Sequence, residues 1–382
     1  MRPTGKGENV TGKQTFSAIR IRFPRCRPLW VLILSLVFGA TQFGSVSAAH
    51  AAVSECDRIW GQSSGIVTEQ VDYVVKTPGS KENLRASLVE GKYVVRLSGW
   101  LYHAASSVAK DAPVLIYNHG SNKDVSEPCA IAKFFVRSGF VVFVPLRRGH
   151  VARTPENVSP EWKSIGSTGV YTDDYAANCQ KNRNCPSCDK ASCPNGKLVV
   201  DYIRQQVEDV ADQIRYIKEH PAIGKNATGK LADTKRISLA GHSFGGSLVV
   251  FANAELKDHN VAISISGAEL SWNNNPNWKT ELSAAMNKAQ QRPIYFLQPA
   301  NARTLAPSEV LYGIAVERKY RAQTKIFPAA PCFKDPCDTS EEPEFRQVHS
   351  TFVRRRDQVE LWAPSVIEFI KRYPLMIANG RL

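Results

Sequence analysis

One short segment of the sequence has the residue types of a nucleophilic centre, and it reads Gly241-His242-Ser243-Phe244-Gly245. This is the G-x-S-x-G pattern of a nucleophile elbow, in which a serine lies on a strained turn between a strand and a helix. Side chains at the two glycine positions would collide with neighbouring backbone. An apolar run, 237–240, precedes the segment, and a helix-compatible run, 247–253, follows it. We therefore predict that Ser243 is a nucleophile at a helix N-terminus, where the dipole favours developing negative charge.

A serine nucleophile needs two backbone donors for the oxyanion that forms when it attacks a carbonyl group. The first is expected to be the N–H of Phe244, directly after the nucleophile. The second is expected in the loop after the apolar run 113–117, where the sequence continues Asn-His-Gly-Ser. We assign it to the N–H of Ser121, and we expect His119 to hold this loop rather than to act in catalysis.

The general base is expected late in the chain, because the partners of such a serine follow in the order Ser, acid, His. Only two of the eight histidines, His259 and His349, come after Ser243. His259 directly precedes a predicted strand and would lie at the wrong end of the sheet. His349 follows the last predicted strand and precedes the final predicted helix, so we assign it as the base that accepts the Ser243 proton.

Five segments of the chain resemble the dienelactone-hydrolase-related α/β-hydrolases, in particular the exported members with a serine nucleophile. They are residues 115–121, 145–150, 241–246, 298–308 and 349–352. The resemblance implies an α/β-hydrolase fold, hydrolysis of carboxylic esters or lactones, and no cofactor. True dienelactone hydrolases use a cysteine nucleophile, whereas this chain has Ser243, which argues against dienelactone itself as the substrate.

The third member of the triad is left open by the resemblance. In this group an Asn-Asp pair follows a late strand and its Asp orients the histidine, but the matching residues here are Asn301 and Ala302. Glu269, after the preceding strand, is the first alternative, since some α/β-hydrolases carry their acid there. Asn301 as a neutral partner is the second, as in papain-like sites, and a Ser–His dyad is the third.

Buried strands and amphipathic helices alternate along the chain. The predicted strands are 66–75, 92–103, 113–117, 140–144, 237–240, 261–265, 293–297 and 325–327, and the predicted helices are 129–136, 198–220, 279–288, 307–321 and a last one through 371, with Pro364 in its first turn. Central runs such as 113–117 are apolar throughout, as in strands that are covered on both faces. The pattern predicts an α/β-hydrolase fold, with a mostly parallel central sheet and helices on both faces.

Residues 1–51 have the features of an export signal. A basic flank, 20–27, precedes an apolar stretch, 29–40, and Ala49-His50-Ala51 is a small-residue cleavage pattern. We predict a cleaved signal peptide and a single mature domain, 52–382, that is periplasmic or secreted, with an uncleaved signal anchor as the alternative. Because the apolar stretch is short for a membrane span, no stable membrane insertion is expected after cleavage.

Eight of the nine cysteines follow residue 51, and an even number in an exported chain favours disulfides. Four of them lie within 179–193. The metal-ligand spacing of Cys185 and Cys188 makes a zinc site an alternative there, but export favours disulfides. The cysteines 332 and 337 are placed to close a small loop. The segment 148–197 has no sustained periodicity, which predicts a cysteine-rich, lid-like insertion beside the substrate pocket.

Arg148, at the start of this insertion, is a candidate for recognition of an acidic substrate. The favoured alternative is a structural ion pair of Arg147 or Arg148 with Asp173 or Asp174.

These features predict a serine hydrolase that cleaves carboxylic esters or lactones through an acyl-enzyme intermediate. One alternative is a serine peptidase of the prolyl-oligopeptidase kind, although no propeller domain precedes the resemblance. Another is a catalytically impaired exported binding protein with a degraded triad, which Ala302 favours. Residues 1–51 carry +6 of the formal charge of +14, and the remaining +8 is spread over the rest of the chain without a long basic run, so no nucleic-acid partner is expected.

Overall fold

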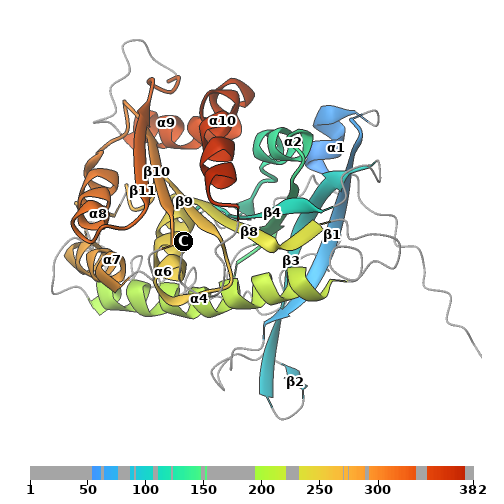
Figure 1. Cartoon of the computed structure of the whole chain (residues 1–382), viewed down its shortest axis with the longest axis horizontal. Coiled ribbons are helices and arrows are strands. Elements are labelled where there is room, and N and C mark those ends of the chain that lie inside the picture. Colours follow the sequence, from blue (N-terminus) through green and yellow to red (C-terminus); the bar gives the residue numbers. More distant parts are fainter. Residues whose placement is uncertain are drawn as a thin grey trace, which may run out of the picture. The chain divides into compact units, whose positions relative to one another are not determined.

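A computed structural model describes residues 54–61, 64–75, 87–89, 92–105, 111–121, 124–147, 151–152, 194–220, 232–269, 271–273, 275–288, 292–332 and 342–374. Within these residues a nine-stranded sheet runs in the order β1-β3-β6-β4-β8-β9-β10-β11, with β2 paired to β3 (Figure 1). From β6 to β11 every neighbouring pair is parallel. The pairs β1–β3, β2–β3 and β3–β6 are antiparallel.

The strands at the centre of the sheet are those with continuous apolar sequences. The strands are β1 (Ile66–Val75), β2 (Ser87–Val89), β3 (Lys92–Ala104), β4 (Ala112–Asn118), β5 (Asp124–Val125), β6 (Val141–Pro145), β7 (Val151–Ala152), β8 (Ala232–His242), β9 (Val261–Ile265), β10 (Ile294–Pro299) and β11 (Ala322–Phe327). All residues of β6, β9 and β10 are buried, because helices cover both faces of the sheet there.

Helices form two layers, one on each face of the sheet (Figure 1). They are α1 (Glu55–Trp60), α2 (Cys129–Arg137), α4 (Pro194–Glu219), α6 (Phe244–Glu255), α7 (Pro276–Lys288), α8 (Ala306–Glu317), α9 (Glu342–Arg354) and α10 (Arg356–Arg372). One core packs α4, α6, α7 and α8 against the sheet and includes Val207, Leu248 and Trp278. The other packs α1, α2, α9 and α10 and includes Phe135 and Trp362.

This arrangement confirms the predicted alternation of strands and helices and corrects it in two places. Pro364 lies inside α10 and does not begin it, because the helix starts at Arg356 and buries Trp362 and Val366. The segment around His349 is helix α9 and not a loop. The predicted signal peptide and most of the predicted insertion, including its cysteines and Arg148, lie outside the described residues. No helix among the described residues is long and apolar enough to cross a lipid bilayer.

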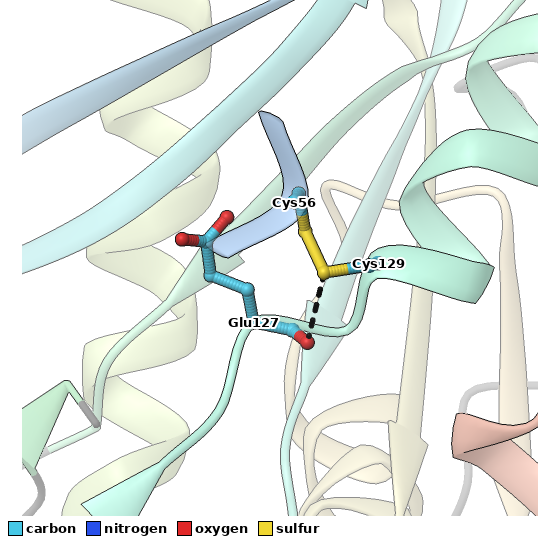
Figure 2. Close-up of side chains that lie close together, drawn as sticks. All are labelled: Cys56, Glu127 and Cys129. Carbon is cyan, nitrogen blue, oxygen red and sulfur yellow. Dashed lines mark hydrogen bonds between the residues drawn. A yellow bond between two sulfur atoms is a disulfide. The ribbon is translucent and has the colours of Figure 1, made fainter. Parts of the chain in front are cut away.

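A disulfide joins helices α1 and α2 through Cys56 and Cys129, whose Cα atoms are 5.1 Å apart (Figure 2). Glu127 lies beside it, and its carboxylate accepts hydrogen bonds of 2.8 Å from the Glu55 N–H and from the Tyr102 hydroxyl. The ligand atoms of Cys56, Glu127 and Cys129 lie within 4.8 Å of one another. Sulfurs joined to each other offer no thiolate, so this group is a cross-link rather than a metal site.

A second disulfide involves Cys332, whereas Cys337, its predicted neighbour in a small loop, lies outside the described residues.

Removing the first cross-link, as Cys56→Ala with Cys129→Ala, should lower the free energy of unfolding by about 4 kcal/mol. The two cysteines are 73 residues apart in sequence, so the cross-link restricts a long loop in the unfolded chain. Urea unfolding in non-reducing buffer measures the effect as a lower midpoint. Cys332 stays unchanged in both proteins, so an equal midpoint would mean that the α1–α2 disulfide does not stabilise the fold.

Candidate active site

Ser243 lies on the sharp turn between strand β8 and helix α6. Its backbone has φ 57° and ψ −119°, a conformation that non-glycine residues adopt at a cost in energy. The Ser243 N–H donates to the carbonyl oxygen of Ile265 at 2.9 Å, which ties the turn to the end of β9. The strained turn therefore places the serine where helix α6 begins, as the sequence pattern predicts.

The glycines around Ser243 are required by close backbone contacts. A Cβ atom on Gly241 would lie 2.2 Å from the carbonyl oxygen of Gly245. A Cβ atom on Gly245 would lie 2.1 Å from the carbonyl oxygen of Asn118 at the end of β4. Both distances are far shorter than atoms tolerate, so the turn can pack against β4 only with glycine at these positions.

His349 lies on helix α9 with its Nδ1 atom 2.8 Å from Oε2 of Glu269. Both side chains are buried, with 7% of the His349 and none of the Glu269 side chain exposed. Removal from water strengthens the interaction of a carboxylate with an imidazole N–H. The carboxylate therefore fixes the orientation of the imidazole ring and leaves the other ring nitrogen, Nε2, for a second partner.

A strained turn after strand β9 positions Glu269. Ser266 and Ala268 have positive φ angles of 47° and 62°, which are uncommon for residues with a side chain. The second carboxylate oxygen of Glu269 accepts a 2.7 Å hydrogen bond from the N–H of Arg303, in the loop after β10. Both oxygens of the buried carboxylate are thus hydrogen-bonded, as a buried charge requires.

Asn301 is engaged elsewhere. Its side-chain amide donates to the carbonyl oxygen of Ala330 at 2.9 Å, and its oxygen accepts from the Ala330 N–H at 2.8 Å. The residue joins the loops after β10 and β11, and no hydrogen bond among the described residues joins it to His349. Of the two side chains considered as partners of the histidine, the structure brings Glu269 to His349 and not Asn301.

Two rings flank the imidazole of His349. The His242 ring lies 4.3 Å from it and the Phe345 ring 5.6 Å, measured between centroids. Burial, together with the adjacent His349, holds the pKa of His242 well below its usual range, so His242 is neutral at pH 7. Within the described part of the chain Nε2 of His349 has no hydrogen-bond partner. Nε2 is thus available to a serine hydroxyl, whose contact can tighten when substrate binds.

The two segments expected to donate to an oxyanion lie next to Ser243. Phe244 is the first residue of α6, and Gly120 is so close that a Cβ atom on it would lie 3.4 Å from the Ser243 Cβ atom. Ser121, the next residue, is exposed and lines the same cavity as Ser243. Both segments therefore lie beside Ser243, where backbone N–H groups can stabilise a tetrahedral oxyanion.

Arg147, after strand β6, connects these two segments. It is fully buried, and its guanidinium donates to the carbonyl oxygen of Gly120 at 2.6 Å. The same group lies 4.7 Å from the centroid of the Phe244 ring, and the Arg147 N–H donates to Nε2 of His119 at 3.2 Å. His119 therefore holds the loop before Ser121, which is the role expected for it.

Comparisons with known proteins find similarity in structure only. No family model matches the sequence, and no curated protein matches it. The acylaminoacyl peptidase of Pyrococcus horikoshii aligns with a TM-score of 0.50 and 11% identity over 83% of this chain and 43% of that chain. For an esterase of Pyrococcus furiosus the values are 0.45 and 13%, over 81% and 94%. For a candidate dienelactone hydrolase of Klebsiella pneumoniae they are 0.42 and 11%, over 78% and 98%.

The chain has the α/β-hydrolase fold. This confirms the predicted fold class, with a mostly parallel sheet and helices on both faces. The chain spans less than half the length of the peptidase it resembles. In this α/β-hydrolase fold the turn after β8 carries Ser243, the turn after β9 carries Glu269, and α9 carries His349.

A cavity of about 210 Å³ adjoins Ser243 and His349. Ser243, His349 and Ser121 line it, as do two arginines of helix α9, Arg346 and Arg354. Sequence reasoning missed both arginines, because the segment was not expected to be helical. The spacing of Arg346, three residues before His349, could have found it on a helix, since residues three apart lie on one face, whereas Arg354, five residues after His349, has no such spacing.

Proposed function

We propose that the protein is a serine hydrolase that cleaves carboxylic esters or lactones, with Ser243 as nucleophile, His349 as base and Glu269 as the acid that orients His349. The observation that carries the proposal is the buried 2.8 Å contact of Glu269 with His349, whose side chain lines the same cavity as the strained Ser243. Strained turns place both Ser243 and Glu269, and backbone strain of this kind concentrates at active sites.

The proposed reaction begins when Oγ of Ser243 attacks the ester carbonyl carbon and Nε2 of His349 takes the hydroxyl proton. Glu269 stabilises the resulting imidazolium, and the N–H groups of Phe244 and Ser121 hold the oxyanion. The C–O bond to the alcohol then breaks, and His349 returns the proton to the leaving oxygen. Water then attacks the acyl carbonyl carbon, with His349 again accepting the proton. The bond to Oγ of Ser243 breaks, His349 returns the proton to Oγ, and the carboxylic acid is released. The reaction needs no cofactor.

The two alternatives have less support. An impaired binding protein was favoured by Ala302, but the hydrogen bond from Arg303 and the contact with His349 give Glu269 the environment of a working acid. A serine peptidase would use the same groups, so amide and ester substrates must be compared directly.

Export is also part of the proposal, supported by the cleavage pattern at 49–51 and the Cys56–Cys129 disulfide. Mass spectrometry of the mature N-terminus tests it.

Labelling with a fluorophosphonate, followed by peptide mapping, tests the proposed function. We expect the label on Ser243, and we expect Ser243→Ala to abolish labelling and to lower ester hydrolysis by about 10⁶-fold. Ser247→Ala is the matched control, because Ser247 is a buried serine one turn further along α6. Wild-type protein that hydrolyses neither esters nor amides and takes no label at Ser243 would refute the proposal.

A further inference from the structure

A second cavity adjoins the candidate active site. It has a volume of about 470 Å³ and lies between helices α1, α2 and α10. The segment that separates the two cavities is short, because Glu127 and Pro128 line the first cavity and Cys129 lines the second. Arg354 lines both. Neither the fold nor the proposed reaction assigns a role to the second cavity.

One side of this cavity is apolar. Ile59 and Trp60 of α1 and Phe134 of α2 line it. Ile59 is 62% exposed, which makes it the most exposed of the large hydrophobic side chains that the structure describes. An aromatic ring and two apolar side chains gathered beside a cavity form a surface that an apolar chain can cover.

The rim of the same cavity is basic. Lys133, Arg137, Arg354 and Arg356 line it with a single acidic residue, Glu360, which forms a 2.6 Å ion pair with Arg356. The Lys133 ammonium lies 5.9 Å from the centroid of the Trp60 ring. Desolvation, and then the charges of Arg137 and Arg356, lower the pKa of Lys133. The cations therefore gather against their mutual repulsion, which a bound anion would relieve.

We propose that this cavity binds an anionic amphiphile, a molecule with one alkyl chain and a phosphate or carboxylate head group. The alkyl chain of the ligand would pack on Ile59, Trp60 and Phe134, and its head group would bind Lys133 and Arg137. An uncharged apolar ligand would leave Lys133 and Arg137 without an anion, and a small anion would leave the apolar side uncovered, so only a ligand with both parts satisfies the whole cavity. The site goes beyond the proposed hydrolysis and does not depend on it.

Isothermal titration calorimetry of the full-length Ser243→Ala protein with monomeric decyl phosphate tests the site. The substitution removes the proposed nucleophile, so a failure of the proposed hydrolysis would leave this result unchanged. We expect saturable binding at one site, weakened at least about tenfold by Lys133→Glu or Arg137→Glu, because each replaces attraction by repulsion. Lys279→Glu is the matched control, since Lys279 lies 5.6 Å from the Trp272 ring on the other helix layer.

The apolar part is tested with Ile59→Ser, which should weaken decyl phosphate binding, against Val316→Ser, an exposed valine on α8 that should not. Inorganic phosphate alone should not saturate the site. Unfolding temperatures verify that each variant is folded. If a charge-reversal variant does not fold, Arg137→Gln is used in its place. No binding of decyl phosphate, or an equal loss in Lys279→Glu, would overturn the proposal. Binding to anionic phospholipid vesicles without binding of the monomer would also overturn it, in favour of a membrane surface.

Discussion

Replacing Glu269 by glutamine should lower kcat/KM for ester hydrolysis by about 10⁴-fold, the cost seen when a serine protease loses the carboxylate that orients its histidine. The carboxylate accepts from His349 at 2.8 Å and from the Arg303 N–H at 2.7 Å, so it selects the tautomer that leaves Nε2 without a proton. A glutamine amide is free to present a donor to Nδ1 instead. That arrangement would place the proton on Nε2, where it blocks acceptance of the Ser243 proton.

Steady-state hydrolysis of a chromogenic ester measures this effect, with the rate of fluorophosphonate labelling as a second readout. Glu127→Gln is the matched control, because Glu127 lines the cavity beside Ser243 and His349 but is hydrogen-bonded to Tyr102 and Glu55 rather than to His349. It should retain most of the activity. If Glu269→Gln retained wild-type kcat/KM, the dyad interpretation would replace the triad.

The elbow was predictable because its chemistry is local. Gly241 and Gly245 restrict the turn through contacts that any G-x-S-x-G segment makes, and the apolar runs on either side identify the strand and the helix. The buried strands were predictable for the same reason. β9 matches its predicted range, 261–265, because every residue of it is buried and small or β-branched.

For the partner of His349, sequence analysis left alternatives open, because the contact of His349 with Glu269 joins residues that are 80 positions apart. Sequence order places Glu269 and Asn301 equally well after neighbouring strands. Packing distinguishes the two side chains, because Asn301 is hydrogen-bonded to Ala330, whereas Glu269 contacts His349 and accepts from the Arg303 N–H. The helical position of His349 was missed although Phe345, Val348 and Phe352 are spaced as on one helix face. The second cavity could not be found from sequence, because α1 and α10 are about 300 residues apart.

Arg147→Met should lower kcat by about 10²-fold with a small change in KM, close to the loss of one oxyanion donor. The guanidinium donates to the Gly120 carbonyl oxygen at 2.6 Å and lies 4.7 Å from the Phe244 ring centroid, so it joins the two segments that we propose to supply the donors. Methionine keeps much of the apolar volume and removes the donor groups. The oxyanion N–H groups would then be less firmly placed, which affects the transition state more than substrate binding.

Arg147→Lys separates this role from simple support of the fold. Lysine keeps the charge and one donor for Gly120 but lacks the planar group that stacks on Phe244, so we expect it to restore part of the kcat lost in Arg147→Met. A role in stability alone predicts a different pattern, in which the unfolding temperature falls while kcat of the folded fraction, titrated with fluorophosphonate, stays at the wild-type value. Loss of kcat per titrated site means that a residue outside the triad sets how well the oxyanion is held, because Arg147 touches the donor segments and not the proposed reacting groups.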